Sequence, residues 1–197
     1  MMDEMIDDDL WAKHQYQVLA GFVHHLAYYR VLSQIYSGMN SKSEFWTRTI
    51  DAHLLRAVID WCMVFGTDSN EIHWKRVVST KSAQAKFRKH LFTATGMTGA
   101  QWKSYWLLMT KFRNNYAAHK TTQGTYPPVP LMDMALRVAY AYDDWFRETV
   151  QALFSDPSLR RRYERLFRTS KQPLTQAVGM GPWLEVEYEG RPPRKQS

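Results

Sequence analysis

The stretch SEFWTRTIDAHLLRAVIDWCMVFG, residues 43–66, carries a regular helical pattern. Its large apolar side chains recur at intervals of three or four residues, which places them on one stripe of an α-helix. Ser43 stands where a side-chain oxygen can cap a helix, and Gly66 stands just past the last apolar residue, where a left-handed residue commonly ends one. The pattern predicts a long helix with one buried face. The stripe consists of Trp46, Ile50, Leu54, Val58, Trp61 and Phe65.

Similar apolar stripes predict helices on both sides of this one. Residues 10–37 form a long stripe that ends at Gly38 and Asn40, and residues 131–154 form another. Thr98 and Gln101 match a capping box at the start of a further helix. Shorter helices are predicted at 71–78, after Ser69 or Asn70, at 82–92, and in a basic segment at 158–168. We therefore predict an all-α protein, an up-and-down bundle of long helices over residues 10–170.

The two ends of the chain differ from the predicted bundle. Residues 1–9 are strongly acidic, and residues 171–197 are rich in proline and glycine. We predict that the C-terminal part is a short non-helical appendage. Within it WLEVEYE, residues 183–189, alternates apolar and acidic side chains like a half-exposed strand, which would need a partner strand.

Composition and charge limit the possible functions. The 197 residues suffice for one domain with a substantial core, and 8 Trp, 11 Tyr and 9 Phe supply large packing groups. The N-terminal sequence lacks a signal-peptide pattern, and no apolar run has the length of a membrane span, so we expect a cytoplasmic protein with no membrane partner. The lone Cys62 stands between Trp61 and Met63, which favours a buried apolar position over a catalytic one.

The net charge of +7 understates how basic most of the chain is. Five of the 19 acidic residues lie in the first nine positions, which leaves 14 acidic against 26 basic residues for the rest. The basic residues cluster in KFRKH (86–90), RRRYER (160–165) and RPPRK (191–195). Such a body favours a polyanionic partner such as RNA, although each cluster alone is also typical of a solvated helix face or tail.

The segment KFRNNYAAHK, residues 111–120, places polar residues beside an aromatic stripe that runs from Trp102 to His119. On an ideal α-helix Arg113 and His119 lie on opposite borders of this stripe, roughly 120° apart, with Tyr116 between them. Both can therefore rim one cleft. Asn115 stands four residues before His119 and can hydrogen-bond its imidazole, whereas Asn114 points elsewhere in this geometry.

The same residues also allow a purely structural interpretation. Arg113 would pair with a carboxylate on the next helix, such as Asp143 or Asp144, and His119 would interact with the helix C-terminus. The remaining histidines have ordinary explanations. His24 and His25 diverge by about 100° on a helix and do not form a metal pair. His25 is expected at the core edge, and ordinary polar or interfacial roles are expected for His53, His73 and His90.

The segment FRNNYAAHK resembles the signature of the HEPN superfamily, in which an arginine and a polar residue are followed by a histidine near the end of a bundle helix. Arg113, Asn114 and His119 match this signature, and Tyr116 with the AAH sequence is similar to the subgroup associated with abortive phage infection. The resemblance in architecture covers roughly residues 10–168. It implies a HEPN-like bundle, a homodimer with facing motifs, and in many members a metal-independent ribonuclease.

That resemblance also implies partners and an alternative. An active member would be a toxin or anti-phage defence component, with a separate antitoxin or nucleotidyltransferase as a possible partner. Other members are non-catalytic binding modules that act through protein or nucleotide partners. A DNA-binding regulator is a weaker alternative, since no helix-turn-helix pair stands out.

The side chains suit RNA cleavage. RNA supplies its own nucleophile, the 2′-hydroxyl, so the enzyme needs a proton acceptor with a pKa near neutrality and a cation for the phosphorane. His119 and Arg113 are the predicted catalytic pair, with Asn114, Asn115 and Tyr116 in support. The chain has no HExxH motif, no paired cysteine ligands and no phosphate-binding glycine loop, and we predict no cofactor and no metal site.

Overall fold

The structural elements of the protein are helices in the part of the chain that the computed structural model describes, which comprises residues 8–40, 43–118, 128–150 and 155–179. No strand occurs within these ranges, and the prediction of an all-α bundle is confirmed. The helices are α1 (Asp8–Leu10), the π-helical η1 (Trp11–Gln15), α2 (Tyr16–Ser37), α3 (Glu44–Phe65), α4 (Trp74–Val77), α5 (Lys81–Thr95), α6 (Gly99–Phe112), the π-helical η2 (Arg113–Ala118), α7 (Met132–Val150) and α8 (Leu159–Gly179).

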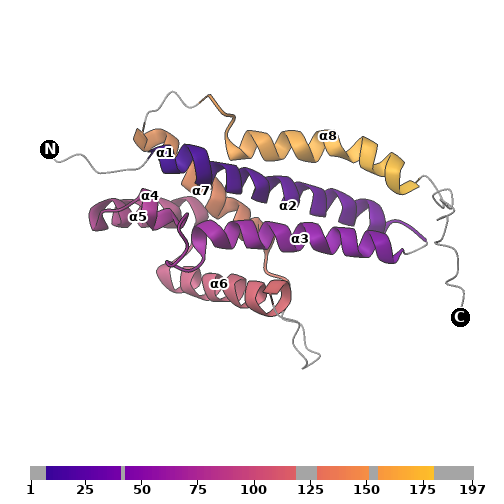
Figure 1. Cartoon of the computed structure of the whole chain (residues 1–197), viewed down its shortest axis with the longest axis horizontal. Helices are drawn as coiled ribbons and strands as arrows, with labels where there is room; N and C mark the ends of the chain where they lie inside the picture. The colour runs from indigo at the N-terminus through magenta and orange to yellow at the C-terminus, as the bar shows by residue number, and fades with distance from the viewer. Residues whose placement is uncertain (1–7, 41–42, 119–127, 151–154, 180–197) are drawn as a thin grey trace, which may run out of the picture.

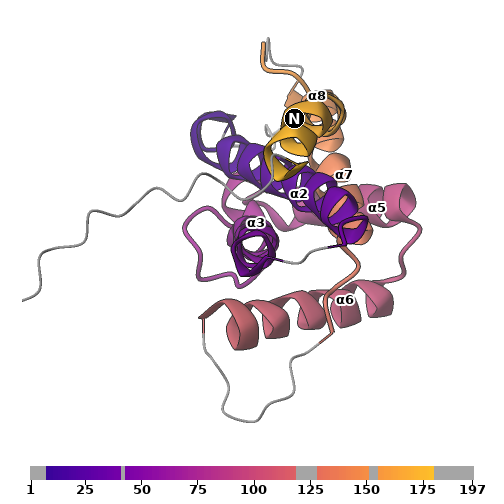
Figure 2. The same cartoon turned by 90° about the vertical axis from the view of Figure 1, so that its right-hand side faces the viewer.

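The long helices α2 and α3 lie side by side and form the centre of the bundle (Figure 1). Helix α8 packs along α2, and α5 packs against α7. Helix α6 lies against α3 on the side away from α8, as the end-on view shows (Figure 2). This arrangement leaves α6 at the edge of the bundle with one face toward solvent.

Aromatic side chains fill the core between these helices. Trp11 stacks on Phe146 with 4.3 Å between ring centroids and meets the edge of Tyr142 at 4.9 Å. Trp61 is fully buried, and its Nε1 donates a hydrogen bond to the carbonyl oxygen of Ala135 at 3.2 Å. Burial of each such side chain stabilises the fold by about 1.5–3 kcal/mol relative to exposure, which accounts for the high aromatic content of the sequence.

Both ends of α3 and the start of α6 lie where the sequence predicted them, but Ser43 and Gly66 do not act in the way that was predicted. The capping box of α6 is confirmed, because Gln101 N donates to Thr98 Oγ1 at 3.2 Å and Thr98 N donates to Gln101 Oε1 at 2.8 Å. Ser43 occupies the N-cap of α3 without a side-chain hydrogen bond. Gly66 ends α3 with a φ of −78°, so it is not left-handed, but a Cβ there would lie 2.2 Å from the Cys62 carbonyl oxygen. Lack of room for a side chain, rather than a positive φ, requires glycine at this position.

The two short helices lie close to their predicted positions. Helix α4 is capped by His73, whose Nδ1 accepts from the backbone N–H of Lys75, so neither Ser69 nor Asn70 is its cap. Helix α5 is capped by Thr80 and ends at the left-handed Gly96, which has a φ of 73°.

The prediction of a non-helical segment from residue 171 is wrong for residues 171–179, because α8 continues through Pro173 to Gly179. Leu174 and Val178 pack in a small apolar cluster with Leu32 and Ile50 of the central helices. Their burial outweighs the hydrogen bond that proline removes from a helix. The strand predicted at 183–189 lies outside the described residues.

The start of α8 is fixed to α7 by a buried carboxylate. Asp143 Oδ2 accepts the backbone N–H of Leu159 at 2.8 Å, and Asp143 Oδ1 accepts Arg147 Nε at 2.8 Å. The same guanidinium donates to the carbonyl oxygen of Asp156 at 3.0 Å. Asp143 therefore satisfies the first amide of α8 from a neighbouring helix, and it orients the basic helix on the bundle.

Candidate functional site

The predicted site begins where α6 changes its winding. Phe112 is buried at the end of α6, and Tyr116 stacks on it with ring centroids 5.1 Å apart. From Arg113 to Ala118 the backbone is π-helical. Such segments are rare and occur often at functional sites, because their wider turn displaces the side chains that follow.

Arg113 lies at the first position of this π-helical turn. Its side chain is half-buried, and its Nε donates to Asn114 Oδ1 at 3.0 Å. Within the described ranges Arg113 forms no ion pair with a carboxylate. Asn114, which ideal α-helical geometry directs elsewhere, is therefore the residue that contacts the arginine.

The carboxylates proposed as structural partners of Arg113 are engaged elsewhere. Asp143 is paired with Arg147 and with the first amide of α8. Asp144 has its oxygen 3.8 Å from Arg160 Nη2. The structural interpretation of Arg113 is thus wrong in the partners that it named.

The structure tests only part of the predicted constellation. Arg113, Asn114, Asn115 and Tyr116 lie together on the π-helical turn, with Asn114 the most exposed. His119 lies outside the described residues, so its distance from Arg113 stays a prediction. The angle of roughly 120° assumed an α-helix and does not apply to a π-helical segment.

Cys62 lies on α3 close to this turn and is structural. It is fully buried, with Sγ 3.9 Å from the carbonyl oxygen of Met109. Burial raises the pKa of its thiol to about 12, and the nearby charge of Arg113 opposes this only in part. A thiol that stays protonated is a poor nucleophile, as expected for a buried apolar cysteine.

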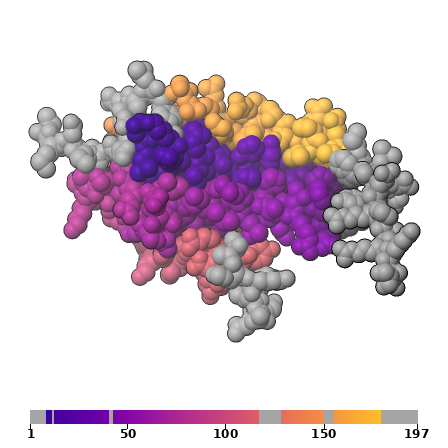
Figure 3. Space-filling model, in the orientation of Figure 1, coloured from indigo at the N-terminus to yellow at the C-terminus, as the bar shows by residue number. Residues whose placement is uncertain are grey.

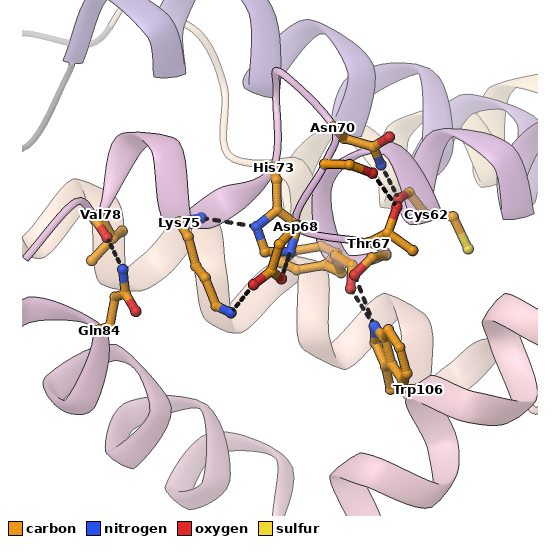
Figure 4. Close-up of polar contacts among 12 residues, drawn as sticks. Cys62, Thr67, Asp68, Asn70, His73, Lys75, Val78, Gln84 and Trp106 are labelled. Atoms are coloured by element: carbon orange, nitrogen blue, oxygen red, sulfur yellow. Dashed lines mark hydrogen bonds and ion pairs between the residues drawn. The ribbon is translucent and has the colours of Figure 1, made fainter. Parts of the chain in front are cut away.

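A polar cluster in the loop between α3 and α4 was not identified from the sequence (Figure 4). Asp68 forms an ion pair with Lys75, and its Oδ1 lies 3.5 Å from His73 Nε2. The hydrogen bond from Lys75 lowers the pKa of Asp68. Burial lowers the pKa of His73 to about 4, so this histidine is neutral at pH 7 and accepts from Lys75 N through Nδ1.

The same loop is tied to its two neighbouring helices. Asn70 Nδ2 donates to the carbonyl oxygens of Cys62 and Met63, at 3.0 and 3.2 Å, near the end of α3. Trp106 Nε1 of α6 donates to the carbonyl oxygens of Phe65 and Gly66, each at 2.9 Å. No sequence motif signals these contacts, because they join residues up to 41 positions apart.

A second unpredicted cluster joins α2 to α3. His25 Nδ1 and His53 Nδ1 are 2.9 Å apart, and the rings of His24 and Tyr28 lie beside them. Burial, followed by the charges of His53 and His24, lowers the pKa of His25 to about 4. His25 was predicted at the core edge and His53 as a polar or interfacial residue, which fits their partly buried positions, but the sequence did not predict their direct contact.

The basic segment 160–165 lies on α8, which runs along one surface of the bundle (Figure 3). Arg160 stacks over Tyr140 at 4.5 Å from the ring centroid, and Arg162 lies 3.8 Å from Asp156. Arg161, Arg165 and Arg168 line an open depression on the same helix. Some of these charges thus stabilise helix packing, and others face solvent.

Comparisons with known proteins give no relative for this chain. No family model matches it, and neither a curated protein nor a solved structure is significantly similar. Among the residues that the structure describes, no helix is long and apolar enough to cross a bilayer.

Proposed function

We propose that this protein is a HEPN-like, metal-independent endoribonuclease that acts in the cytoplasm as a toxin or anti-phage defence component. Cleavage would proceed through attack by the 2′-hydroxyl of the RNA substrate. Arg113 and His119 would be the catalytic residues, supported by Asn114, Asn115 and Tyr116. A homodimer would bring two such sets together, and a separate antitoxin or nucleotidyltransferase would be a fitting partner.

The environment of Arg113 is the observation that supports this proposal best. The guanidinium lies at the end of α6, is held by Asn114 through Nε, and has no carboxylate partner within the described ranges. An arginine that is oriented through Nε but not neutralised keeps its terminal nitrogens for a phosphate group. The stacked pair of Phe112 and Tyr116 supports the turn that carries it.

The reaction requires two proton transfers and one charge neutralisation. One His119 accepts the proton of the 2′-hydroxyl while its oxygen attacks the adjacent phosphorus. Arg113 stabilises the negative charge that develops on the phosphorane oxygens. The bond from phosphorus to the 5′-oxygen then breaks, and the second His119 of the dimer protonates that oxygen. The products are a 2′,3′-cyclic phosphate and a 5′-hydroxyl.

The decisive experiment combines product analysis with two variants and two matched controls. Purified protein is incubated with a mixed RNA pool in EDTA, and the ends of the products are identified. His119→Ala should lower the rate by about 10² to 10⁴, because it removes proton transfer. Arg113→Lys should lower the rate with little change in RNA affinity, because lysine keeps the charge but loses the planar fork.

The controls are His14→Ala and Arg137→Lys, which change exposed residues of the same types that are not among the proposed site residues. Both should cleave at the wild-type rate. Each variant must keep the melting temperature and oligomeric state of the wild type. Full activity in folded His119→Ala and Arg113→Lys would refute the proposed mechanism.

The second candidate is a non-catalytic HEPN-type helical binding module with protein or nucleotide partners. A cavity lined by three tryptophans and several cations, next to α6, favours it. Nucleotide binding without cleavage of any RNA in the pool would support this function over the ribonuclease.

A further inference from the structure

A cavity of about 230 Å³ lies between the end of α3, the loop after it, α4, α5 and α6. We call it the tryptophan pocket, after three of the residues that line it. Its walls include the rings of Trp74, Trp102 and Trp106 and the cationic side chains of Lys75, Arg88 and Lys103. Flat aromatic surfaces and cations thus converge on a space that sequence analysis did not predict.

The aromatic walls of the tryptophan pocket are held in place by the fold. Trp74 is buried, with 5% of its surface exposed, and its ring lies 4.9 Å from that of Phe87. Trp106 is fixed by its two hydrogen bonds to the carbonyl oxygens of Phe65 and Gly66. Trp102 packs on Trp61 with centroids 6.1 Å apart. Binding of a stacked ligand would therefore cost little conformational entropy, because these rings are already ordered.

The charge of the pocket favours an anion. Lys75 is neutralised by Asp68, and His73 is uncharged at pH 7. Arg88 lies 5.5 Å from the ring centroid of Trp74, and Lys103 is exposed on α6. Neither of these two forms an ion pair in the described part of the chain, although the charge of Arg88 also acts on the single carboxylate of the pocket, Asp68. Two positive charges therefore remain beside the aromatic walls.

We propose that the tryptophan pocket binds one nucleotide unit, with its base against the rings of Trp102 and Trp106 and its phosphate at Arg88 and Lys103. Base stacking on aromatic rings combined with cationic phosphate contacts is the general chemistry of single-stranded nucleic-acid recognition. Pockets for drug-sized ligands occupy about 300–1,000 Å³, so this smaller cavity suits one base rather than a dinucleotide. The unit can belong to an RNA strand or to a free nucleotide.

The pocket is aligned with the proposed cleavage site, and this part of the inference rests on the proposed function. Trp102 and Trp106 are four residues apart on α6, and Arg113, the first residue of η2, follows Trp106 by seven, so all three start from one side of this continuous helix. The rise from Trp106 to Arg113 is about 10 Å along the helix. This corresponds to about three stacked nucleotides at 3.4 Å each. The pocket would then anchor a strand whose scissile bond lies at Arg113.

Binding is measured with two probes that the enzyme cannot cleave. One is a fluorescein-labelled 2′-O-methyl hexa-adenylate, which lacks the nucleophilic hydroxyl, followed by anisotropy. The other is AMP, followed by calorimetry. Tight binding of the hexamer with weak AMP binding assigns the pocket to a strand, and tight binding of AMP assigns it to a free nucleotide.

The variants separate stacking from charge. Trp102→Leu should weaken binding about 5- to 150-fold, the range expected for loss of one stacked base. Because Trp102 also contacts the core, Arg88→Gln provides a second test at an exposed side chain. It should weaken binding and reduce the salt dependence of hexamer affinity by about 0.7 in slope. The matched controls are Arg76→Gln and Phe45→Ala, both exposed and outside the pocket.

The outcomes distinguish this inference from the proposed ribonuclease activity. Wild-type binding that both pocket variants weaken, and both controls leave unchanged, supports the pocket even if no RNA is cleaved. Failure of the wild type to bind either probe overturns it, as do dissociation constants that change less than about twofold in folded Trp102→Leu and Arg88→Gln. In either of those cases cleavage that depends on His119 would still support the ribonuclease.

Discussion

His25 of α2 and His53 of α3 face each other with their Nδ1 atoms 2.9 Å apart, so one ring must donate and the other must accept. The pair joins the two central helices in a partly buried setting. Protonation of both rings would replace this hydrogen bond with repulsion. The stability of the central helix pair should therefore depend on pH.

The first prediction concerns the sign of that dependence. The pKa of His25 is about 4 in the fold, against about 6.5 when unfolded, and the pKa of His53 is also lowered, mainly by burial. Between these values the unfolded chain binds more protons, so the free energy of unfolding should fall as pH falls from about 6.5 to about 4. His53→Gln should show a smaller fall, measured by urea unfolding at about pH 7 and about pH 5.

His14→Gln is the control for this experiment, because His14 is exposed and should leave the pH dependence as in the wild type. His73 has a similarly lowered pKa, so part of the acid sensitivity should persist in His53→Gln. An identical fall in His53→Gln and the wild type would show that the histidine pair does not contribute.

The second prediction concerns the close contact between α2 and α3 at Gly21. A Cβ at this position would lie 2.9 Å from Oδ2 of the buried Asp60. Gly21→Ala should lower the free energy of unfolding by up to about 2 kcal/mol, because the cost of moving the crowded carboxylate exceeds the gain in helix propensity of about 1 kcal/mol. Gly99→Ala is the matched control, since its nearest contacts are Phe92 atoms at 3.9 Å. That change should stabilise by about 0.4–1 kcal/mol. Equal effects of the two substitutions would contradict the crowding at Gly21.

The third prediction tests the attachment of α8. Asp143→Ala leaves the buried amide of Leu159 and the guanidinium of Arg147 without their shared partner. The loss should be about 3–5 kcal/mol in chemical denaturation. Asp144→Ala removes a neighbouring, half-exposed carboxylate 3.8 Å from Arg160 and should cost less than about 1 kcal/mol. A small effect at Asp143 would mean that α8 is held by its apolar face alone.

The fourth prediction separates the two asparagines of the proposed site. Asn114→Ala should lower kcat without moving the pH profile of RNA cleavage, because Asn114 contacts Arg113, whose proposed role is to stabilise charge and not to transfer a proton. Asn115→Ala should move the profile if its amide hydrogen-bonds His119 as the sequence predicts. The same pH shift in both variants would contradict these separate positioning roles.

Local signals in the sequence predicted the helices well. The capping box of Thr98 and Gln101 depends on residues three apart, and it forms as predicted. At Gly66 the residue type was interpreted correctly as a helix stop, but the reason is the nearby Cys62 carbonyl rather than a left-handed backbone. Pro173 misled the prediction, because the apolar contacts of Leu174 and Val178 with α2 and α3 are not visible in a local pattern.

The candidate site could be predicted only as a set of residue types. The sequence identified Arg113 on the aromatic helix, but the π-helical turn and the contact with Asn114 are properties of the folded backbone. The tryptophan pocket is lined by residues of α4, α5 and α6, and these residues come together only when the chain folds. Such long-range groupings carry no fixed spacing, so periodicity cannot reveal them.

One buried amide bears on how small this protein can be made. Gln15 Nε2 donates to the carbonyl oxygen of His73 at 3.0 Å, and Gln15 Oε1 accepts the hydroxyl of Tyr142 at 2.6 Å. A fragment that starts after Gln15 would leave both groups buried without these partners, at about 1–3 kcal/mol each. The minimal autonomous folding unit therefore includes the π-helical turn before α2, and a shortened version for crystallisation should retain it.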